Sequence, residues 1–233
     1  MHKTKIYLDS AGIKTIKFYK NNKDIKGFTT NPSLIAKSKI KNYKLFAKQA
    51  IKFVRNKSIS FEVLSDNLNL MHIEAIKISS WGKNVYVKIP IVNSRGLSTQ
   101  SLIKKLCKQN IKINITAFFT FEQIRIVKKS IEKNSDVIVS IFCGRIADTG
   151  RDPKKFIIYA KNIFKKYKNV KILWASTREF YNIIEANNCR TDIITVSDDI
   201  YKKKKFYNKD LNKFSKETVK TFYIDGLNSK LKI

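Results

Sequence analysis

Residues 84–90 read Asn-Val-Tyr-Val-Lys-Ile-Pro, and this run decides which fold the rest of the chain supports. β-Branched and aromatic residues favour a strand, and the proline ends it. An apolar strand between helical stretches indicates a parallel sheet covered on both faces, where an ammonium must be paired, reach water or lose its proton. Because only the neutral amine attacks a carbonyl, Lys88 is a candidate Schiff-base nucleophile. The alternative is a strand-end lysine that snorkels to solvent.

Seven further apolar runs resemble this strand, and each alternates with a stretch of helical periodicity. The eight predicted strands are residues 5–9, 27–30, 58–64, 84–90, 111–116, 136–142, 170–175 and 191–196. Without a linker between them, they predict an α/β fold, a single (β/α)8 TIM barrel over residues 1–233. Spaced apolar residues over 211–231 predict an extra C-terminal helix, with helix and tail over about 212–233. A doubly wound sheet is the alternative, but no glycine-rich first turn supports a dinucleotide site.

Several predicted helices carry start signals. Pro32 occupies a first helical position after the second strand. Thr120 with Gln123, and Ser176 with Glu179, have the spacing of a capping box. These signals predict helices that begin immediately after the second, fifth and seventh strands.

Length and composition are those of one globular domain: 233 residues, of which 43% are hydrophobic. No apolar run approaches the ~20 residues of a membrane span, and the first six residues lack a signal-peptide core. The three cysteines are odd in number and widely spaced, which predicts reduced thiols in a cytoplasmic protein. With only His2 and His72 and no cysteine pair at ligand spacing, we expect no metal site.

The formal net charge of +30 suggests anionic partners. Only seven of the 48 basic residues are arginine, whereas nucleic-acid interfaces favour arginine. The lysines are scattered over nearly every predicted helix, and only Lys202–Lys205 form a dense run. We therefore expect no specific nucleic-acid partner and no membrane partner, and interpret the charge as attraction for small anionic substrates.

Polar side chains gather at the carboxyl ends of the predicted strands, where barrels of this kind carry their active sites. These residues are Asp9, Thr30, Asn31, Ser60, Glu62, Lys88, Asn114, Thr116, Ser140, Ser176 and Arg178, and the aromatic Phe142 lies at the same end of its strand. Any one of them has an ordinary explanation, such as a turn former, a β-branched filler or a helix cap. The same feature on seven strands predicts one shared site.

The residue types suit carbonyl chemistry. Lys88 would form an imine, while Asp9 and Glu62 would divide the acid and base work on the carbinolamine and the substrate hydroxyl. Neutral hydrogen bonds for sugar hydroxyls or a catalytic water would come from Asn31, Asn114 and Thr116.

An anion site is predicted after the seventh strand, where barrels often hold phosphate. It would consist of Arg145, Arg178 and the helix start at Ser176. The alternative for both arginines is a solvated surface charge.

Seven short motifs occur in a characteristic order: Tyr7-Leu8-Asp9, Thr29-Thr30-Asn31-Pro32-Ser33-Leu34, Glu62-Val63, Val87-Lys88-Ile89-Pro90, Asn114-Ile115-Thr116, Gly144-Arg145 and Ala175-Ser176-Thr177-Arg178. In this order and spacing, over essentially the full length, the chain resembles a small transaldolase, of the group that also contains the fructose 6-phosphate aldolases. The resemblance implies that Lys88 is the Schiff-base lysine, Asp9 the acid/base and Glu62 the catalytic glutamate. It implies that Thr116 positions the catalytic water. The implied substrate contacts are Asn31, Asn114 and Ser140, and the implied phosphate-binding residues are Arg145, Ser176 and Arg178.

Two positions separate the branches of this group. The aldolase branch has Gln where this chain has Glu62 and Tyr where it has Phe142, so the resemblance favours the transaldolase branch. Ala147 replaces an acidic residue common after the Gly-Arg, and Trp174 stands where a small residue is more usual. A side chain as large as Trp174 beside the phosphate site could reshape the pocket, so the preferred substrate does not transfer with the chemistry.

The resemblance implies a class I transaldolase of the pentose phosphate pathway that needs no metal or organic cofactor. It would transfer a dihydroxyacetone unit from a ketose phosphate to an aldose phosphate. One alternative is an aldolase that releases free dihydroxyacetone, and another is an inactive barrel that binds polyanions. The C-terminal segment resembles the family's helix that packs on a neighbouring subunit, which predicts a homo-oligomer.

Overall fold

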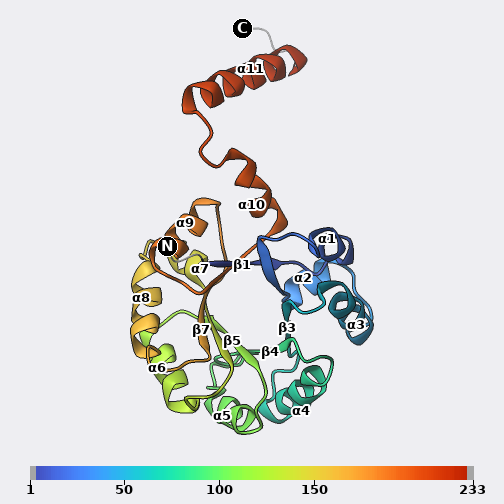
Figure 1. The fold of residues 1–233 in the computed structure, drawn as a ribbon, viewed down its shortest axis with the longest axis vertical. Helices are drawn as coiled ribbons and strands as arrows, with labels where there is room; N and C mark the ends of the chain where they lie inside the picture. Colours follow the sequence, from blue (N-terminus) through green and yellow to red (C-terminus); the bar gives the residue numbers. More distant parts are fainter. Residues whose placement is uncertain (1–3, 230–233) are drawn as a thin grey trace. The chain divides into compact units, whose positions relative to one another are not determined.

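Eight parallel strands close into a barrel in sequence order in the computed structural model, which describes residues 4–229 (Figure 1). The strands are β1 (Lys5–Asp9), β2 (Ile25–Thr29), β3 (Ser58–Glu62), β4 (Val85–Pro90), β5 (Ile113–Phe118), β6 (Val137–Ile141), β7 (Val170–Trp174) and β8 (Ile193–Val196). β1 pairs with both β2 and β8, which closes the barrel. The predicted (β/α)8 fold is therefore confirmed.

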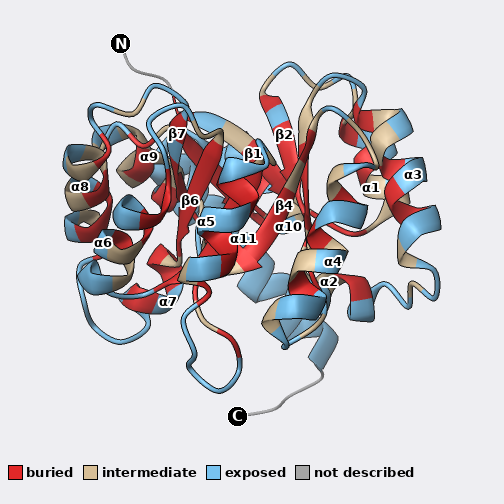
Figure 2. Cartoon of the chain, turned by 90° about the horizontal axis from the view of Figure 1, so that it is seen from below, coloured by how far each residue is buried: buried red, intermediate tan, exposed pale blue. Residues whose placement is uncertain are grey.

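Helices alternate with the strands and form a ring around them (Figure 1). They are α1 (Ile13–Tyr19), α2 (Pro32–Lys37), α3 (Tyr43–Val54), α4 (Leu68–Ser79), α5 (Gln100–Lys108), α6 (Phe121–Ser130), α7 (Cys143–Ala147), α8 (Lys154–Ile163) and α9 (Tyr181–Asn188). A further short helix, α10 (Asp198–Lys202), follows β8. Figure 2 shows the consequence: the strands are mostly buried, and the exposed residues lie on the helices and the connecting loops. This is why the strands read as near-continuous apolar runs.

The core has two parts, because successive strand residues point to opposite faces of the sheet. The larger part lies between strands and helices and includes Phe28, Phe61 and Trp174. The smaller part surrounds Tyr7 and Leu173 inside the barrel. Side chains thus fill the inside of the barrel around these residues.

Two of the three predicted helix starts are confirmed. Pro32 lies at the first position of α2, and the Asn31 side chain caps the helix. Both hydrogen bonds of the Thr120–Gln123 capping box are present at the start of α6.

The capping box predicted at Ser176 and Glu179 is wrong. Helix α9 begins only at Tyr181, and Ser176 has a φ of +62°, in the left-handed region. The N–H groups of Arg178 and Glu179 donate instead to Oδ1 of Asn182. The predicted helix terminus at the anion site is therefore an irregular loop.

The chain divides into two compact units, Met1–Tyr201 and Lys202–Ile233. Within the described part, the second unit contains a short 3-10 helix η1 (Lys203–Phe206) and helix α11 (Leu211–Ser229). The predicted C-terminal helix is thus present, although the last predicted helical residues, 230 and 231, and the tail to 233 lie outside the described residues. No residue of α11 is buried. None of the helices described is both long and apolar enough to cross a membrane.

Candidate active site

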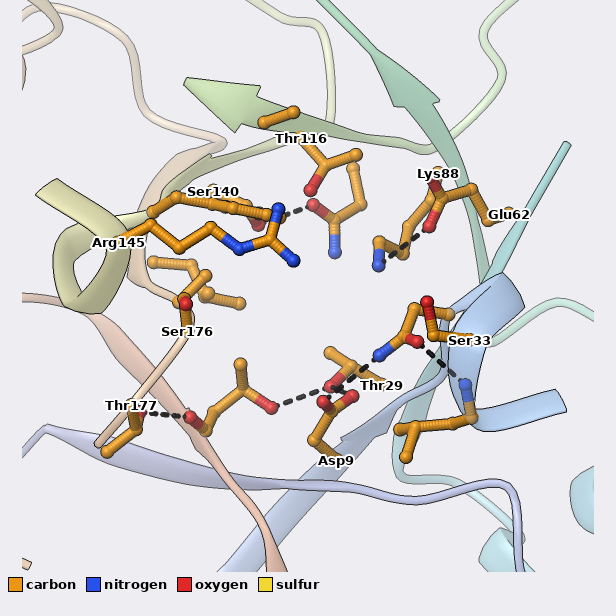
Figure 3. Close-up of a pocket in the computed structure, with 18 of the residues that line it drawn as sticks. Asp9, Thr29, Ser33, Glu62, Lys88, Thr116, Ser140, Arg145, Ser176 and Thr177 are labelled. Atoms are coloured by element: carbon orange, nitrogen blue, oxygen red, sulfur yellow. Dashed lines mark hydrogen bonds and ion pairs between the residues drawn. The ribbon is translucent and has the colours of Figure 1, made fainter. Parts of the chain in front are cut away.

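A pocket of about 580 Å³ opens at the carboxyl ends of the strands (Figure 3). All but two of the residues predicted for the site line it: Asp9, Asn31, Glu62, Lys88, Asn114, Thr116, Ser140, Phe142, Arg145, Ser176 and Arg178. Strands that are far apart in the sequence, and the segments that directly follow them, supply these residues, so closure of the barrel brings them together.

Lys88 lies between two polar residues on the neighbouring strands, because β4 pairs Lys88 with Glu62 of β3 and with Asn114 of β5. Its Nζ is 3.0 Å from Glu62 Oε2 and donates to the carbonyl oxygen of Thr30 at 2.9 Å. Only 8% of the Lys88 side chain is exposed. The ammonium is therefore paired inside the pocket, and the snorkelling alternative is wrong.

Asp9 ends β1 and accepts two hydrogen bonds. The Thr29 hydroxyl donates to Oδ1 at 2.7 Å, and Asn31 Nδ2 donates to Oδ2 at 3.2 Å. Burial raises the pKa of Asp9 above its ordinary value, against the opposing effects of the Lys88 charge and the Thr29 hydrogen bond. A carboxyl group that holds its proton more tightly than a free aspartate is suited to acid and base catalysis near neutral pH.

The amide of Asn31 has only one orientation that satisfies both of its neighbours. Its Oδ1 accepts from the backbone N–H of Leu34 at 2.9 Å, so Nδ2 must face Asp9. The helix cap of α2 therefore also orients the carboxylate of Asp9.

Tyr43 of α3 holds the backbone of Glu62, and the sequence gave no reason to predict this contact. Strand β2 ends at Thr29, so Glu62 lacks a strand partner on that side. The Tyr43 hydroxyl accepts from the Glu62 N–H at 2.9 Å and donates to its carbonyl at 3.1 Å. The Tyr43 ring packs edge-on against Phe61 and Trp81. This contact steadies the strand end that presents the glutamate to Lys88.

Asn114 belongs to a hydrogen-bonded chain inside the barrel. Ser140 Oγ donates to Asn114 Oδ1 at 2.6 Å, and Asn114 Nδ2 donates to Ser60 Oγ at 3.1 Å. All three side chains are buried. The chain fixes the amide with its donor side toward β3.

Thr30 and Ser60 are the two predicted site residues that the structure places outside the pocket lining. The Thr30 hydroxyl donates to the Ser60 carbonyl at 2.9 Å, and the Ser60 hydroxyl supports Asn114. Thr29, one residue earlier, points into the pocket in place of Thr30. Their predicted placement in the pocket is therefore corrected: both contact neighbouring site residues from behind the lining.

Thr116 lines the pocket with a hydroxyl that has no hydrogen-bond partner within residues 4–229, although the residue is only 2% exposed. Ala117, which follows it, has a φ of +64°, and the pairing of β5 with β6 shifts between Ile115 and Phe118. Such irregularities re-aim side chains next to active sites. A buried hydroxyl requires a partner, so this one is placed to bind a water or a substrate oxygen.

The two arginines of the predicted anion site differ in their contacts. Arg178 forms a fork with Asp148, in which Nε donates to Oδ2 at 3.0 Å and Nη2 donates to the same oxygen. This pairing lowers the pKa of Asp148. The Arg145 guanidinium lies 5.2 Å from the centre of the Phe142 ring and points into the pocket (Figure 3). In the part of the chain that the structure describes, Arg145 has no ion pair, so it offers the more available charge.

Gly144 explains how the loops after β6 and β7 come together at this site. A Cβ on Gly144 would lie 1.6 Å from the carbonyl oxygen of Ser176. Any other residue would therefore separate Arg145 from Ser176.

Neither of the two residues that depart from the family pattern lines the pocket. Trp174 is 1% exposed and packs between the strands and the helices rather than in the pocket. Ala147 is exposed, and Asp148, one residue later, supplies the carboxylate for Arg178.

Thr29, Lys37, Tyr43 and Thr195 are among the pocket or supporting residues that were not predicted from the sequence. Thr195 had a usable signal, since it is a polar residue near the carboxyl end of the predicted strand 191–196. Tyr43 had none, because its contact with Glu62 depends on how α3 packs against β3.

Comparison with known proteins agrees with this geometry. The family model "Transaldolase/Fructose-6-phosphate aldolase" matches residues 6–227. A "Probable transaldolase" of Nitrosopumilus maritimus is 34% identical over 194 residues, covering 82% of this chain and 83% of that protein. A "Probable transaldolase" of Thermoplasma volcanium is 36% identical over 195 residues, with coverage of 82% and 83%.

The solved structures that the chain matches share its barrel. The orotidine 5'-monophosphate decarboxylase of Metallosphaera sedula aligns with a TM-score of 0.52 at 12% identity, covering 93% of this chain and 97% of that one. Identity this low shows the fold alone.

Proposed function

The chain belongs to the transaldolase/fructose-6-phosphate aldolase family, and we propose that it is a class I transaldolase. It would transfer a dihydroxyacetone unit from a ketose phosphate to an aldose phosphate. The observation that carries this proposal is the buried amine of Lys88, 3.0 Å from the Glu62 carboxylate, in a pocket that also contains Asp9. The guanidinium of Arg145 in the same pocket suits a phosphate on the substrate.

The proposed reaction begins when the neutral amine of Lys88 attacks the ketose carbonyl and forms a carbinolamine. Loss of water gives an iminium, which draws electrons from the adjacent carbon–carbon bond. A base removes the proton of the substrate's C4 hydroxyl, the bond between C3 and C4 breaks, and an aldose phosphate leaves. The three-carbon enamine that remains on Lys88 adds to an acceptor aldehyde, and water then releases the product.

The two carboxyl groups suit different proton transfers. Asp9, whose pKa is raised by burial, would take the C4 hydroxyl proton and return it when the enamine attacks the acceptor. Glu62, in contact with Lys88, would move protons on the carbinolamine. The Thr116 hydroxyl, which has no hydrogen-bond partner within residues 4–229, would hold the water that enters or leaves there. This division leaves no step that requires a metal or an organic cofactor.

Dependence on an acceptor distinguishes a transaldolase from an aldolase. With fructose 6-phosphate alone, we expect at most one equivalent of glyceraldehyde 3-phosphate per active site, because the enamine has no aldehyde to attack. Adding erythrose 4-phosphate should start continuous turnover. A coupled enzyme assay that detects glyceraldehyde 3-phosphate measures this turnover. We expect Glu62→Gln to shift the balance toward release of free dihydroxyacetone.

Two outcomes would contradict the proposal in different ways. Continuous release of dihydroxyacetone by the unmodified protein without acceptor would identify an aldolase. No turnover with either sugar, together with tight RNA binding that weakens steeply with salt, would support the polyanion-binding alternative.

Arg145 is expected to bind the substrate phosphate. Loss of a charge-assisted hydrogen-bonded contact costs about 1.5–3 kcal/mol, so Arg145→Ala should raise the KM for fructose 6-phosphate about 10- to 100-fold. The kcat/KM for unphosphorylated fructose should be unchanged, measured from the sedoheptulose 7-phosphate formed from erythrose 4-phosphate, because this donor releases glyceraldehyde without a phosphate. Arg125→Ala is a matched control, because Arg125 pairs with Glu122 on the exposed surface of α6. An equal loss with both sugars would show that Arg145 supports the fold rather than the phosphate.

We propose that the reaction belongs to the pentose phosphate pathway in the cytoplasm. The sugars of this pathway carry a carbonyl group, which a lysine nucleophile can attack, and a phosphate, which an arginine can bind. Cys107, Cys143 and Cys189 are free thiols, which supports a reducing compartment. Recovery of the native protein in a secreted, disulfide-linked form would contradict the location.

We also propose that the protein is a homo-oligomer. Leu211, Val219, Phe222 and Leu227 on α11 are each 62% exposed or more, which is unusual for apolar residues on one helix. Packing of this helix on a second copy would bury them. A monomeric mass by light scattering at micromolar concentration would contradict this assembly.

A further inference from the structure

Two threonine hydroxyls, one from each strand that neighbours β1, form a hydrogen-bonded chain that ends on Asp9. Thr29 of β2 donates to Asp9 Oδ1 at 2.7 Å, and its Oγ1 lies 2.6 Å from Oγ1 of Thr195 on β8. Strands β2 and β8 flank β1, so the chain of hydroxyls crosses the inside of the barrel behind Asp9. Thr29 is 3% exposed and Thr195 is 7% exposed, and both line the pocket.

The number of protons decides the direction of these hydrogen bonds. A threonine hydroxyl has one proton to donate and can also accept. When Asp9 is ionised it can only accept, so the Thr29 proton points to Asp9. The short contact with Thr195 must then be donated by Thr195. The ionised state of Asp9 therefore requires a chain that runs from Thr195 through Thr29 to the carboxylate.

The direction can reverse when Asp9 is protonated. The carboxylic acid can then donate to Thr29, which donates to Thr195, and the Thr195 proton turns toward the pocket. The other partner of Asp9 does not reverse, because Asn31 is locked by the Leu34 N–H. The hydroxyl chain is thus the adjustable part of the surroundings of Asp9.

We propose that Thr195 is a positioning residue for proton transfer at Asp9, acting through Thr29 by supplying the hydrogen bond that orients the Thr29 hydroxyl toward the carboxylate. This inference rests on the proposed function, in which Asp9 exchanges a proton with the substrate. It adds a residue outside the motifs of the family resemblance, on a strand for which no site residue was predicted. The backbone carbonyl of Thr195 accepts from the Thr177 hydroxyl at 2.5 Å, which steadies this part of β8.

Loss of the Thr195 hydroxyl should destabilise the ionised form of Asp9 more than the protonated form. Hydrogen bonds along a chain that ends on a charge strengthen one another, and bonds to a carboxylate are stronger than bonds to a neutral acid. The charged groups that face Asp9 are Lys88 and Glu62, and neither changes in a Thr195 variant. The pKa of Asp9 should therefore rise.

The test compares Thr195→Ser with Thr195→Ala, which differ only in the hydroxyl. In the donor-cleavage reaction, Thr195→Ala should shift the acidic limb of the kcat profile upward by about half a pH unit and lower kcat about ten-fold, while KM stays the same. Thr195→Ser should keep the profile of the unmodified chain. Thr99→Ala is the control for loss of a buried threonine, since Thr99 donates to the Pro90 carbonyl outside the pocket.

A direct titration separates this inference from the proposed function. The infrared band of the Asp9 carboxylic acid, identified by its loss in Asp9→Asn, should disappear at a higher pH in Thr195→Ala than in the unmodified chain. Thr195→Val, which keeps the shape of the side chain, should show the same shift, whereas a shift in the alanine variant alone would assign the effect to packing and overturn the inference. Equal midpoints in the serine, alanine and unmodified proteins would also overturn the role of Thr195. An unmodified protein that titrates as described but does not cleave ketose phosphates would overturn only the proposed function.

Discussion

Replacing Lys88 by methionine is expected to lower kcat/KM for fructose 6-phosphate cleavage by at least about 10⁴-fold, since the proposed mechanism loses the nucleophile that forms its covalent intermediate. Methionine keeps most of the apolar volume of the side chain. The measurement is the coupled assay with erythrose 4-phosphate as acceptor. Retention of more than about one per cent of the activity would show that another group forms the intermediate, or that none is formed.

The Lys88→Met variant leaves the carboxylate of Glu62 without its ion-pair partner, and this effect on stability requires its own control. Lys88 pairs with Glu62, whose side chain is 15% exposed, and removal of one partner leaves a largely buried carboxylate unpaired. Thermal unfolding should therefore show that Lys88→Met is less stable than the double variant Lys88→Met/Glu62→Gln, while both are inactive. Lys112→Met, at a lysine 43% exposed and paired with Asp136, should retain activity.

Asp9→Asn should lower kcat by about 10²- to 10⁴-fold, because an amide cannot exchange the proton of the substrate hydroxyl. KM should change little, since the side chain keeps its size. Steady-state kinetics in the same assay measure both constants. A variant with near-normal kcat would assign the proton transfer to another group, of which Glu62 is the nearest candidate.

The same substitution should change the pH dependence of stability. Burial raises the pKa of Asp9 in the folded protein, so the folded state binds this proton more tightly than the unfolded state. Its stabilising contribution is present below the unfolded pKa and is lost as the pH rises through the folded pKa. The amide of the Asp9→Asn variant does not titrate, so the difference in Tm between variant and unmodified protein should grow in favour of the variant with rising pH. A difference that stays constant from about pH 4 to about pH 8 would contradict the raised pKa.

The fold and much of the pocket could be predicted from the sequence, because parallel strands bring their carboxyl ends to one face. Lys88, Glu62 and Asn114 lie on three consecutive strands, and recognising the strands was enough to place them together. Their mutual orientation required no knowledge of the helices.

The errors occur where one residue of register or one loop contact decides the outcome. Thr30 was predicted in the pocket and Thr29 was not, because a shift of one residue along a strand moves a side chain to the other face. The spacing of Ser176 and Glu179 matches a capping box, but it carries no information on the loop that Gly144 brings against Ser176.

Contacts between distant segments left no sequence signal. The pair of Asp148 and Arg178 joins residues that are 30 positions apart, and Tyr43 reaches Glu62 from the helix before its strand. The link between Thr29 and Thr195 spans 166 positions and depends on β8 closing against β1. Such contacts become visible only when the barrel is closed.

The most direct test of the central claim is to trap the intermediate. The protein, mixed with fructose 6-phosphate and treated with borohydride, should carry one reduced three-carbon adduct on the peptide that contains Lys88, located by mass spectrometry. Mapping is decisive in this chain, because lysine and arginine together account for 48 residues and many lysines are open to nonspecific modification. We expect the adduct to be absent from Lys88→Met. No adduct in the unmodified protein, or the same adduct on another lysine in both proteins, would contradict the assignment of Lys88 as the Schiff-base residue.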